Sequence, residues 1–190
     1  MRTFVTVSHL VPADGDWGLD DLAGGAGRVD LVCRNVQAAL HWSHDLRPDT
    51  QFVACFVADP DAPRCVRIDP TRIRNLHPDE RSTAARLRKA LRHPCPDPWW
   101  EEVEPGVEVA PFDLGDLLVD LEGTPVVLHK DGARLEDAIL PDDPVFLLGD
   151  HLPLTDDELA LAPDAVRISL GDRWLHGNHI IAVMNWWLDR

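Results

Sequence analysis

The stretch GGAGRVDLVCRNVQAALHWSHDLR, residues 24–47, has charged side chains at both ends of an amphipathic segment. Its start carries Arg28, Asp30 and Arg34, and its end carries a similar mixture of His44, Asp45 and Arg47. One interpretation is a solvated helix, in which Asp30 and Arg34 form an ion pair worth roughly 0.2–0.5 kcal/mol. The other interpretation is that both clusters face something anionic.

Arg28 is the residue that favours the second interpretation. A cation in the first turn of a helix is opposed by the helix dipole. This placement is easier to understand if an anion such as a phosphate joins Arg28 at the exposed amides of the helix start. The sequence therefore indicates an anion-binding position at the start of this segment.

Three apolar runs in the second half end in polar or glycine-containing turns: residues 128–132 (LHKDG), 148–151 (LGDH) and 169–172 (SLGD). In open α/β sheets, ligands bind outside the carboxyl ends of the strands, where glycine lets a backbone come close. Each Gly-Asp step taken alone is explained as an ordinary turn. Three in succession predict a cleft with exposed amides and carboxylates.

Several common chemistries lack their motifs. The sequence has no GxxxxGK[ST] loop, no GxGxxG spacing after a strand and no GxSxG elbow, which disfavours P-loop nucleotide hydrolysis, a Rossmann dinucleotide site and a serine hydrolase. His176 and His179 stand three apart, but without acidic neighbours at ligand spacing this pair is more often structural. The four cysteines form no CxxC pair, so we expect free thiols and no metal.

The elements that must position these residues follow from hydrophobic periodicity. Alternation predicts strands at 3–10, 51–58 and 64–69, and helical spacing predicts helices at 29–43 and 79–92. The run 93–106, rich in Pro and Trp, is interpreted as a loop or flap whose Trp99 and Trp100 pack on the body or stack on bases. Four further apolar runs, GVEVAPF, TPVVLHKDG, DPVFLLGDH and DAVRISLGD, suit a parallel sheet covered on both faces, and 179–190 a buried helix.

Composition limits the function classes further. The chain has 190 residues, 45% of them hydrophobic, and a formal net charge of −15 with 16 Arg and two Lys. No apolar run is long enough to cross a membrane, so we expect a cytoplasmic protein. An acidic surface disfavours nucleic acid binding. However, residues 64–92 contain nine basic and three acidic side chains, a local basic face that is compatible with RNA.

Five segments, taken together and in order, resemble the TrmY family of tRNA pseudouridine-54 N1-methyltransferases in the SPOUT superfamily. They are GRVDLVCRNVQAALHWSHDLRPD, HPDERSTAARLRKAL, EPGVEV, PVFLLGDHLPLTDDE and RISLGDRWLHGNHIIAVMNWWLD. The resemblance covers most of the chain. It implies one domain over residues 1–190, an α/β fold with a C-terminal trefoil knot, a homodimer, and S-adenosylmethionine as cofactor.

The resemblance also implies site residues. The cofactor positions that carry over are Leu128, Gly149, Ser169, Leu170, Gly171, Asp172, Leu175 and Ile180. The family often has cysteine in place of Ile180 and Ser-Pro in place of Gly171-Asp172. The implied reaction moves a methyl group to N1 of a pseudouridine in the tRNA T-loop, and N1 must lose a proton.

Three carboxylates are candidates for accepting that proton: Asp30, Asp45 and Asp150. We favour Asp30, with Arg28 and Arg34 orienting it as a carboxylate. Arg28, Arg34, Arg47 and Arg81 are the expected contacts to RNA phosphates or uracil carbonyls. Two alternatives stay open: a SPOUT methyltransferase acting on another RNA, such as an rRNA pseudouridine, and a non-catalytic dimer that binds RNA or a ligand.

Overall fold

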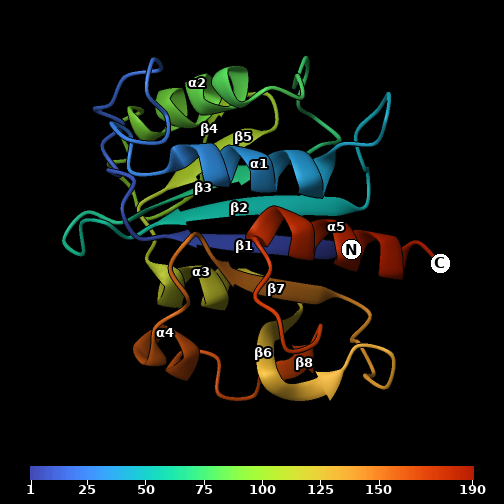
Figure 1. Ribbon diagram of the computed structural model, residues 1–190. Helices are drawn as coiled ribbons and strands as arrows, with labels where there is room; N and C mark the ends of the chain where they lie inside the picture. Colours follow the sequence, from blue (N-terminus) through green and yellow to red (C-terminus); the bar gives the residue numbers. More distant parts are fainter.

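The computed structural model describes residues 1–190 and contains one sheet of eight strands with five helices (Figure 1). The strands are β1 (Arg2–Ser8), β2 (Thr50–Phe56), β3 (Arg64–Ile68), β4 (Glu101–Glu104), β5 (Val107–Ala110), β6 (Thr124–Arg134), β7 (Pro144–Gly149) and β8 (Val166–Ser169). The helices are α1 (Val29–Leu40), α2 (Glu80–Leu91), α3 (Leu114–Asp120), α4 (Asp156–Ala160) and α5 (Gly177–Leu188).

The sheet has a parallel half and an antiparallel half. Its strand order is β4-β5-β3-β2-β1-β7-β6-β8, and the five strands from β2 to β8 in this order pair in parallel. The remaining pairs, β2–β3, β3–β5 and β4–β5, are antiparallel. The expected parallel sheet is therefore correct for β6, β7 and β8 but wrong for the run GVEVAPF, which forms β5. The links β2–β3 and β4–β5 are short hairpins, too short for the crossover that a parallel pair needs.

The two faces of the sheet carry two separate hydrophobic clusters. Along β2, Phe52, Ala54 and Phe56 point to one face, whereas Val53 and Cys55 point to the other. The first cluster is completed by α1, α2 and α5, and the second by α3 and the residues around α4 (Figure 1). Because side chains alternate along a strand, one sequence supplies both cores. The expected covering of both faces by helices is confirmed.

Two expected boundaries are wrong. The first helix ends at Leu40 and not at Ser43, because the chain turns back: His41 bridges Leu46, and the amide of Trp42 donates to the Asp45 carbonyl over 2.8 Å. The segment 93–106 is not wholly a loop, because its last residues form edge strand β4.

The tryptophans of this segment behave differently from each other. Trp100 packs edge-on against Phe112, donates to Asp120 over 2.7 Å, and lies under the Arg67 guanidinium at 4.1 Å. Trp99 is 71% exposed. The expected packing on the body is therefore correct for Trp100 alone.

Strand β6 is interrupted at the place where the sequence indicated a turn. Its pairing with β8 shifts between Leu128 and Ala133, both of which lie opposite Ile168. The strand therefore bulges over His129–Gly132 and then continues to Arg134. Gly132 is required there, because an added Cβ would lie 2.6 Å from the backbone of Arg167 and Ile168. The bulge interrupts the pairing of His129 and Lys130 with β8, and both residues line the cleft described below.

No helix of the protein has the length and apolar character needed to cross a membrane.

Candidate active site

A cleft opens at the carboxyl ends of β6, β7 and β8. Its larger lobe is a cavity of about 560 Å³, lined by residues from the ends of β6 and β7, the following loop, α4 and the start of α5. A smaller lobe of about 190 Å³ lies against the β6 bulge and the segment after β8. The two lobes share five lining residues, Leu128, His129, Trp174, Leu175 and Ile180, so they belong to one cleft.

The wall after β7 is built by a tight turn. An added Cβ on Gly149 would lie 2.1 Å from the carbonyl oxygen of Leu152, so only glycine fits. The Asp150 amide donates to the Val7 carbonyl over 3.0 Å, and the Asp150 carboxylate accepts from the Leu152 amide over 2.9 Å. These hydrogen bonds anchor the turn to β1. The backbone of the turn thereby lies along the cavity.

The wall after β8 is built by another turn. The Ser169 hydroxyl accepts from the amide of Gly171 over 3.2 Å. Gly171 has a φ of +109° with no atom within 4 Å of an added Cβ, so its outer side faces open space. This conformation is one that side-chain-bearing residues rarely adopt. The backbone of this segment thereby forms part of the lining of the smaller lobe.

All eight residues expected at the cofactor site line this cleft. Gly149 lines the larger lobe, the run Ser169–Asp172 lines the smaller one, and Leu128, Leu175 and Ile180 line both. The cavity has the volume and the mostly apolar lining that are typical of small-ligand sites. The structure thus brings together three turns that are about 20 residues apart in sequence.

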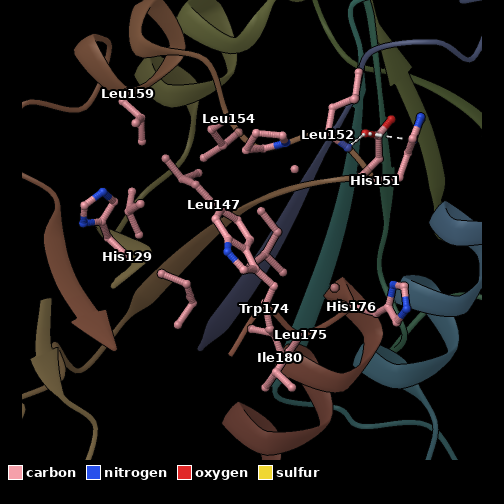
Figure 2. Close-up of a pocket in the computed structure, with 17 residues that line it drawn as sticks. His129, Leu147, His151, Leu152, Leu154, Leu159, Trp174, Leu175, His176 and Ile180 are labelled. Atoms are coloured by element: carbon pink, nitrogen blue, oxygen red, sulfur yellow. Dashed lines mark hydrogen bonds and ion pairs between the residues drawn. The ribbon is translucent and has the colours of Figure 1, made fainter. Parts of the chain in front are cut away.

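Sequence reasoning missed several lining residues. Trp174 is 88% exposed and reaches across the middle of the cavity, while His151 and His176 lie on one side of it (Figure 2). His176 and His179 contact each other edge to face, with ring centroids 5.6 Å apart. No group of three or more histidine, cysteine or acidic side chains is arranged to hold a metal ion.

A buried polar cluster lies behind the larger lobe. The Asp150 carboxylate is only 1% exposed and accepts from the amide of His9 over 3.0 Å and from the hydroxyl of Ser8 over 3.3 Å. One of its oxygens also lies 3.4 Å from Nδ1 of His9 and 3.3 Å from Nδ1 of His151. The other ring nitrogen of His9, Nε2, lies 3.0 Å from Glu158. These contacts tie the ends of β1 and β7 to α4.

Arg28 and Asp30 form a close pair at the start of α1. Arg28 precedes the helix with a φ of 71°, and its guanidinium donates to both carboxylate oxygens of Asp30, over 2.9 and 3.1 Å. Burial raises the pKa of Asp30, but the hydrogen bonds and charges of Arg28 and Arg34 outweigh it and hold this pKa below its ordinary value. Hydrogen bonding to Asp30 raises the pKa of Arg28, with a further contribution from the charge of Asp150.

The four arginines expected to contact RNA are divided between two places. Arg34 lies 3.3 Å from Asp30 and donates to Glu80 over 2.7 Å, which joins the starts of α1 and α2. Arg81 adjoins Glu80, and its side chain is 63% exposed beside Asp20. Arg28, Arg34 and Arg81 therefore surround neighbouring helix starts.

Arg47 lies at the other end of α1. Its side chain is only 11% exposed, is bonded to Asp189 over 2.6 Å and stacks on Trp42. Burial raises the pKa of Asp189, but its hydrogen bonds to Arg47 and Arg2 outweigh this and keep the pKa low. Arg47 therefore anchors α5, and its expected contact with RNA stays a prediction. Asp45, the alternative proton acceptor, lies in the same turn, away from the cleft lining.

The basic segment 64–92 is largely neutralised. Six of its nine basic side chains pair with carboxylates: Arg67 with Glu108, Arg72 with Glu102, Arg81 with Asp20, Arg86 and Lys89 with Glu104, and Arg92 with Asp16. Arg64 instead donates to the carbonyls of Leu91 and His93. The local excess of positive charge therefore stabilises the antiparallel half more than it forms a free basic face.

Comparisons with known proteins give consistent matches. A family model described as "Putative SAM-dependent RNA methyltransferase" matches residues 1–190. Proteins named tRNA (pseudouridine(54)-N(1))-methyltransferase are 38% identical in Methanocella arvoryzae, covering 100% of both chains, and 40% identical in Haloferax volcanii, covering 100% of this chain and 96% of the other. A third, from Thermococcus kodakarensis, is 35% identical and is covered over 99% of its length.

The fold is also found among solved structures. Archaeoglobus fulgidus Nep1, bound to S-adenosylhomocysteine, superimposes with a TM-score of 0.62 at 12% identity, covering 97% of this chain and 94% of Nep1.

Proposed function

The chain belongs to the family of SAM-dependent RNA methyltransferases, and from this premise we propose that it methylates N1 of pseudouridine 54 in tRNA. The observation that carries the proposal is the convergence of the turns after β6, β7 and β8 on one cleft. Close relatives that carry this activity in their names support the choice of base and position.

The residues of the cleft fit S-adenosylmethionine. The backbone of the Gly149 turn and of the Ser169–Asp172 segment, together with the Asp172 carboxylate, would hold the polar parts of the cofactor. Leu128, Leu175 and Ile180 would provide apolar contacts to the rest of the molecule. When bound, this methyl donor supplies an activated methyl group, so the protein mainly has to align the acceptor nitrogen with the methyl carbon.

The RNA contacts we propose are Arg28, Arg34 and Arg81. A guanidinium donates well to phosphates and carbonyls, and these three gather at the neighbouring starts of α1 and α2. Arg28 donates two hydrogen bonds to Asp30, so the two side chains hold each other in place. The target base must leave its stack to reach the methyl donor.

We also propose a homodimer, a C-terminal trefoil knot and a cytoplasmic location, all three as implied by the family resemblance. The surface of α5 supports the dimer: Val183 is 36% and Trp186 is 63% exposed, one helical turn apart. Trp174 and Leu175, 88% and 39% exposed, lie in the segment just before this helix. A second copy packing here would cover apolar area that water now contacts.

The proposal is tested by two measurements on the wild-type protein. Calorimetric titration with S-adenosylhomocysteine should show one site per chain. Incubation with S-adenosylmethionine and a tRNA that carries pseudouridine 54 should yield N1-methylpseudouridine on nucleoside mass analysis. Cofactor binding without tRNA methylation would favour another RNA, such as an rRNA pseudouridine, and absence of cofactor binding would favour the non-catalytic alternative.

A further inference from the structure

His151 is the histidine of the cleft whose ring lies beside a buried carboxylate. Its Nδ1 lies 3.3 Å from an oxygen of Asp150, whose side chain is 1% exposed, whereas the His151 side chain is 26% exposed and lines the larger lobe. The two other cleft histidines differ from it. His129 lies 3.8 Å from Asp131, which is 73% exposed, and His176 contacts another histidine.

The carboxylate of Asp150 favours one of the two neutral forms of the His151 ring. Asp150 accepts hydrogen bonds from the amides of His9 and Leu152 and from the Ser8 hydroxyl. Nδ1 of His151 lies 3.3 Å from one of its oxygens, at ion-pair distance but without hydrogen-bond alignment. An acceptor at this distance favours the neutral ring with its proton on Nδ1, in which Nε2 is the proton acceptor.

Resting on the proposed function, we propose that His151 is the catalytic base that takes the N1 proton of the target base, and that Asp150 is its positioning residue. In this step the N1–H bond breaks and the proton moves to Nε2 of His151. The electron pair left on N1 forms the bond to the methyl carbon, and the pair of the sulfur–methyl bond goes to sulfur, which becomes neutral. The imidazolium then returns its proton to water.

Asp30 is less suited to this step. Both of its oxygens accept from Arg28, Arg34 lies 3.3 Å from one of them, and its side chain is 4% exposed. It is also not part of the cleft lining. His151, in contrast, lies on the lining.

The first test replaces His151 by Gln. Removing a general base costs about 10²–10⁴-fold in rate, so we expect kcat on pseudouridine-54 tRNA to fall by at least 100-fold. The dissociation constant for S-adenosylhomocysteine should stay within threefold. His93→Gln is the matched control, because His93 also pairs with a carboxylate, Glu101 at 3.1 Å, but does not line the cleft. It should retain wild-type kcat.

The second test is chemical rescue. Added imidazole should restore part of the kcat of His151→Ala in proportion to its concentration, and should not affect His93→Ala. Nitrogen-15 NMR of the free protein, with His151 assigned through the Gln variant, should show protonated Nδ1 and unprotonated Nε2. This readout does not depend on turnover.

The outcomes separate the two proposals. A wild-type protein that does not methylate this tRNA overturns the proposed function. A wild-type protein that does, together with a His151→Gln variant within threefold of its kcat, overturns the role of His151. A loss of rate in Asp30→Asn but not in His151→Gln would identify Asp30 as the proton acceptor.

Discussion

At the scale of single residues, Gly149 is the position where one added carbon disturbs the cleft most. A Cβ there would lie 2.1 Å from a backbone oxygen, which cannot move aside without opening the turn after β7. We expect Gly149→Ala to weaken S-adenosylhomocysteine binding at least tenfold in calorimetry. Gly18→Ala, where the nearest atom is 4.0 Å away, is the control and should bind normally. Equal affinities for the two variants would move the ligand away from this turn.

Asp30 leads to a prediction about pH. Its folded-state pKa is lowered, because the hydrogen bonds and charges of Arg28 and Arg34 outweigh the effect of burial. A lowered pKa contributes stability that is fully present above the unfolded value of about 3.9 and is lost as the pH falls through the folded value. Asp30→Asn should therefore cost about 1–3 kcal/mol of unfolding free energy at pH 7.

Urea unfolding of wild type and Asp30→Asn at several pH values checks this prediction. The difference between them should narrow steadily below about pH 4. Asp20→Asn, whose carboxylate is 94% exposed beside Arg81, should show almost no difference at any pH. A constant gap down to pH 2 for Asp30→Asn would contradict the linkage.

Some of the site residues could be predicted from sequence and others could not. Gly149 and Ser169 follow apolar strands directly, so their local pattern already indicates a strand-end turn. His151 has no such signal, because its significance depends on Asp150 being held by Ser8 and His9, about 140 residues earlier in the chain. The pairing of Arg47 has no local signal for the same reason: its partner Asp189 is 142 residues away.

At the scale of elements, His9 connects two segments that form one wall of the cleft. It lies between Asp150 in the turn after β7 and Glu158 in α4, and Glu158 also closes the capping box with Thr155. Because α4 has only five residues and no fully buried side chain, this contact adds to the packing of Leu159 on the second hydrophobic cluster. We expect His9→Leu to raise hydrogen exchange over residues 150–161 and to weaken S-adenosylhomocysteine binding about tenfold.

Two variants make this prediction specific. His9→Gln retains a donor toward one carboxylate and should recover part of the affinity. His93→Leu removes an equivalent pair beside β4 and should leave both the exchange of residues 150–161 and the affinity unchanged. If residues 150–161 of His9→Leu showed the same hydrogen exchange as those of wild type, the contacts of His9 would not stabilise this wall of the cleft.

The strands also show what a local sequence pattern can and cannot predict. Period-two alternation located β1, β2 and β3 to within two residues, since it reports which side chains are buried. It does not report the direction of the neighbouring strand, which is why β5 was expected in a parallel sheet. Strand β4 was missed because its residues, EEVE, are exposed or half-buried at the sheet edge and carry no apolar stripe.

At the scale of the whole molecule, the net charge of −15 limits how RNA can bind. Only Arg28, Arg34 and Arg81 are proposed as contacts, so few phosphates are neutralised. The slope of log affinity against log salt should be about −2 to −3, since each contact contributes roughly 0.7–0.9.

Arg81→Ala should reduce this slope by about 1 in filter-binding assays. The control is Arg72→Ala, since Arg72 pairs with Glu102 and is not a proposed contact. A slope of −6 or steeper would require a basic surface elsewhere.

The exposed face of α5 provides the last prediction, on assembly. Val183 and Trp186 lie outward on this helix, and the guanidinium of Arg190 stacks on Trp186 and Trp187 at 4.9 and 4.4 Å. A charge placed in the centre of this face cannot be buried against a second copy without a large desolvation cost. Trp186→Glu should therefore convert the proposed dimer to a monomer in light scattering after size exclusion.

Trp99→Glu is the matched control, because Trp99 is 71% exposed but lies beside edge strand β4, far along the sheet from α5. It should keep the wild-type mass. Since Trp174 and Leu175 lie both in the cofactor cleft and just before α5, the monomer should also bind S-adenosylhomocysteine more weakly. A Trp186→Glu variant with dimer mass would place the interface on another face, and a monomer with unchanged affinity would show that each cleft is complete within one chain.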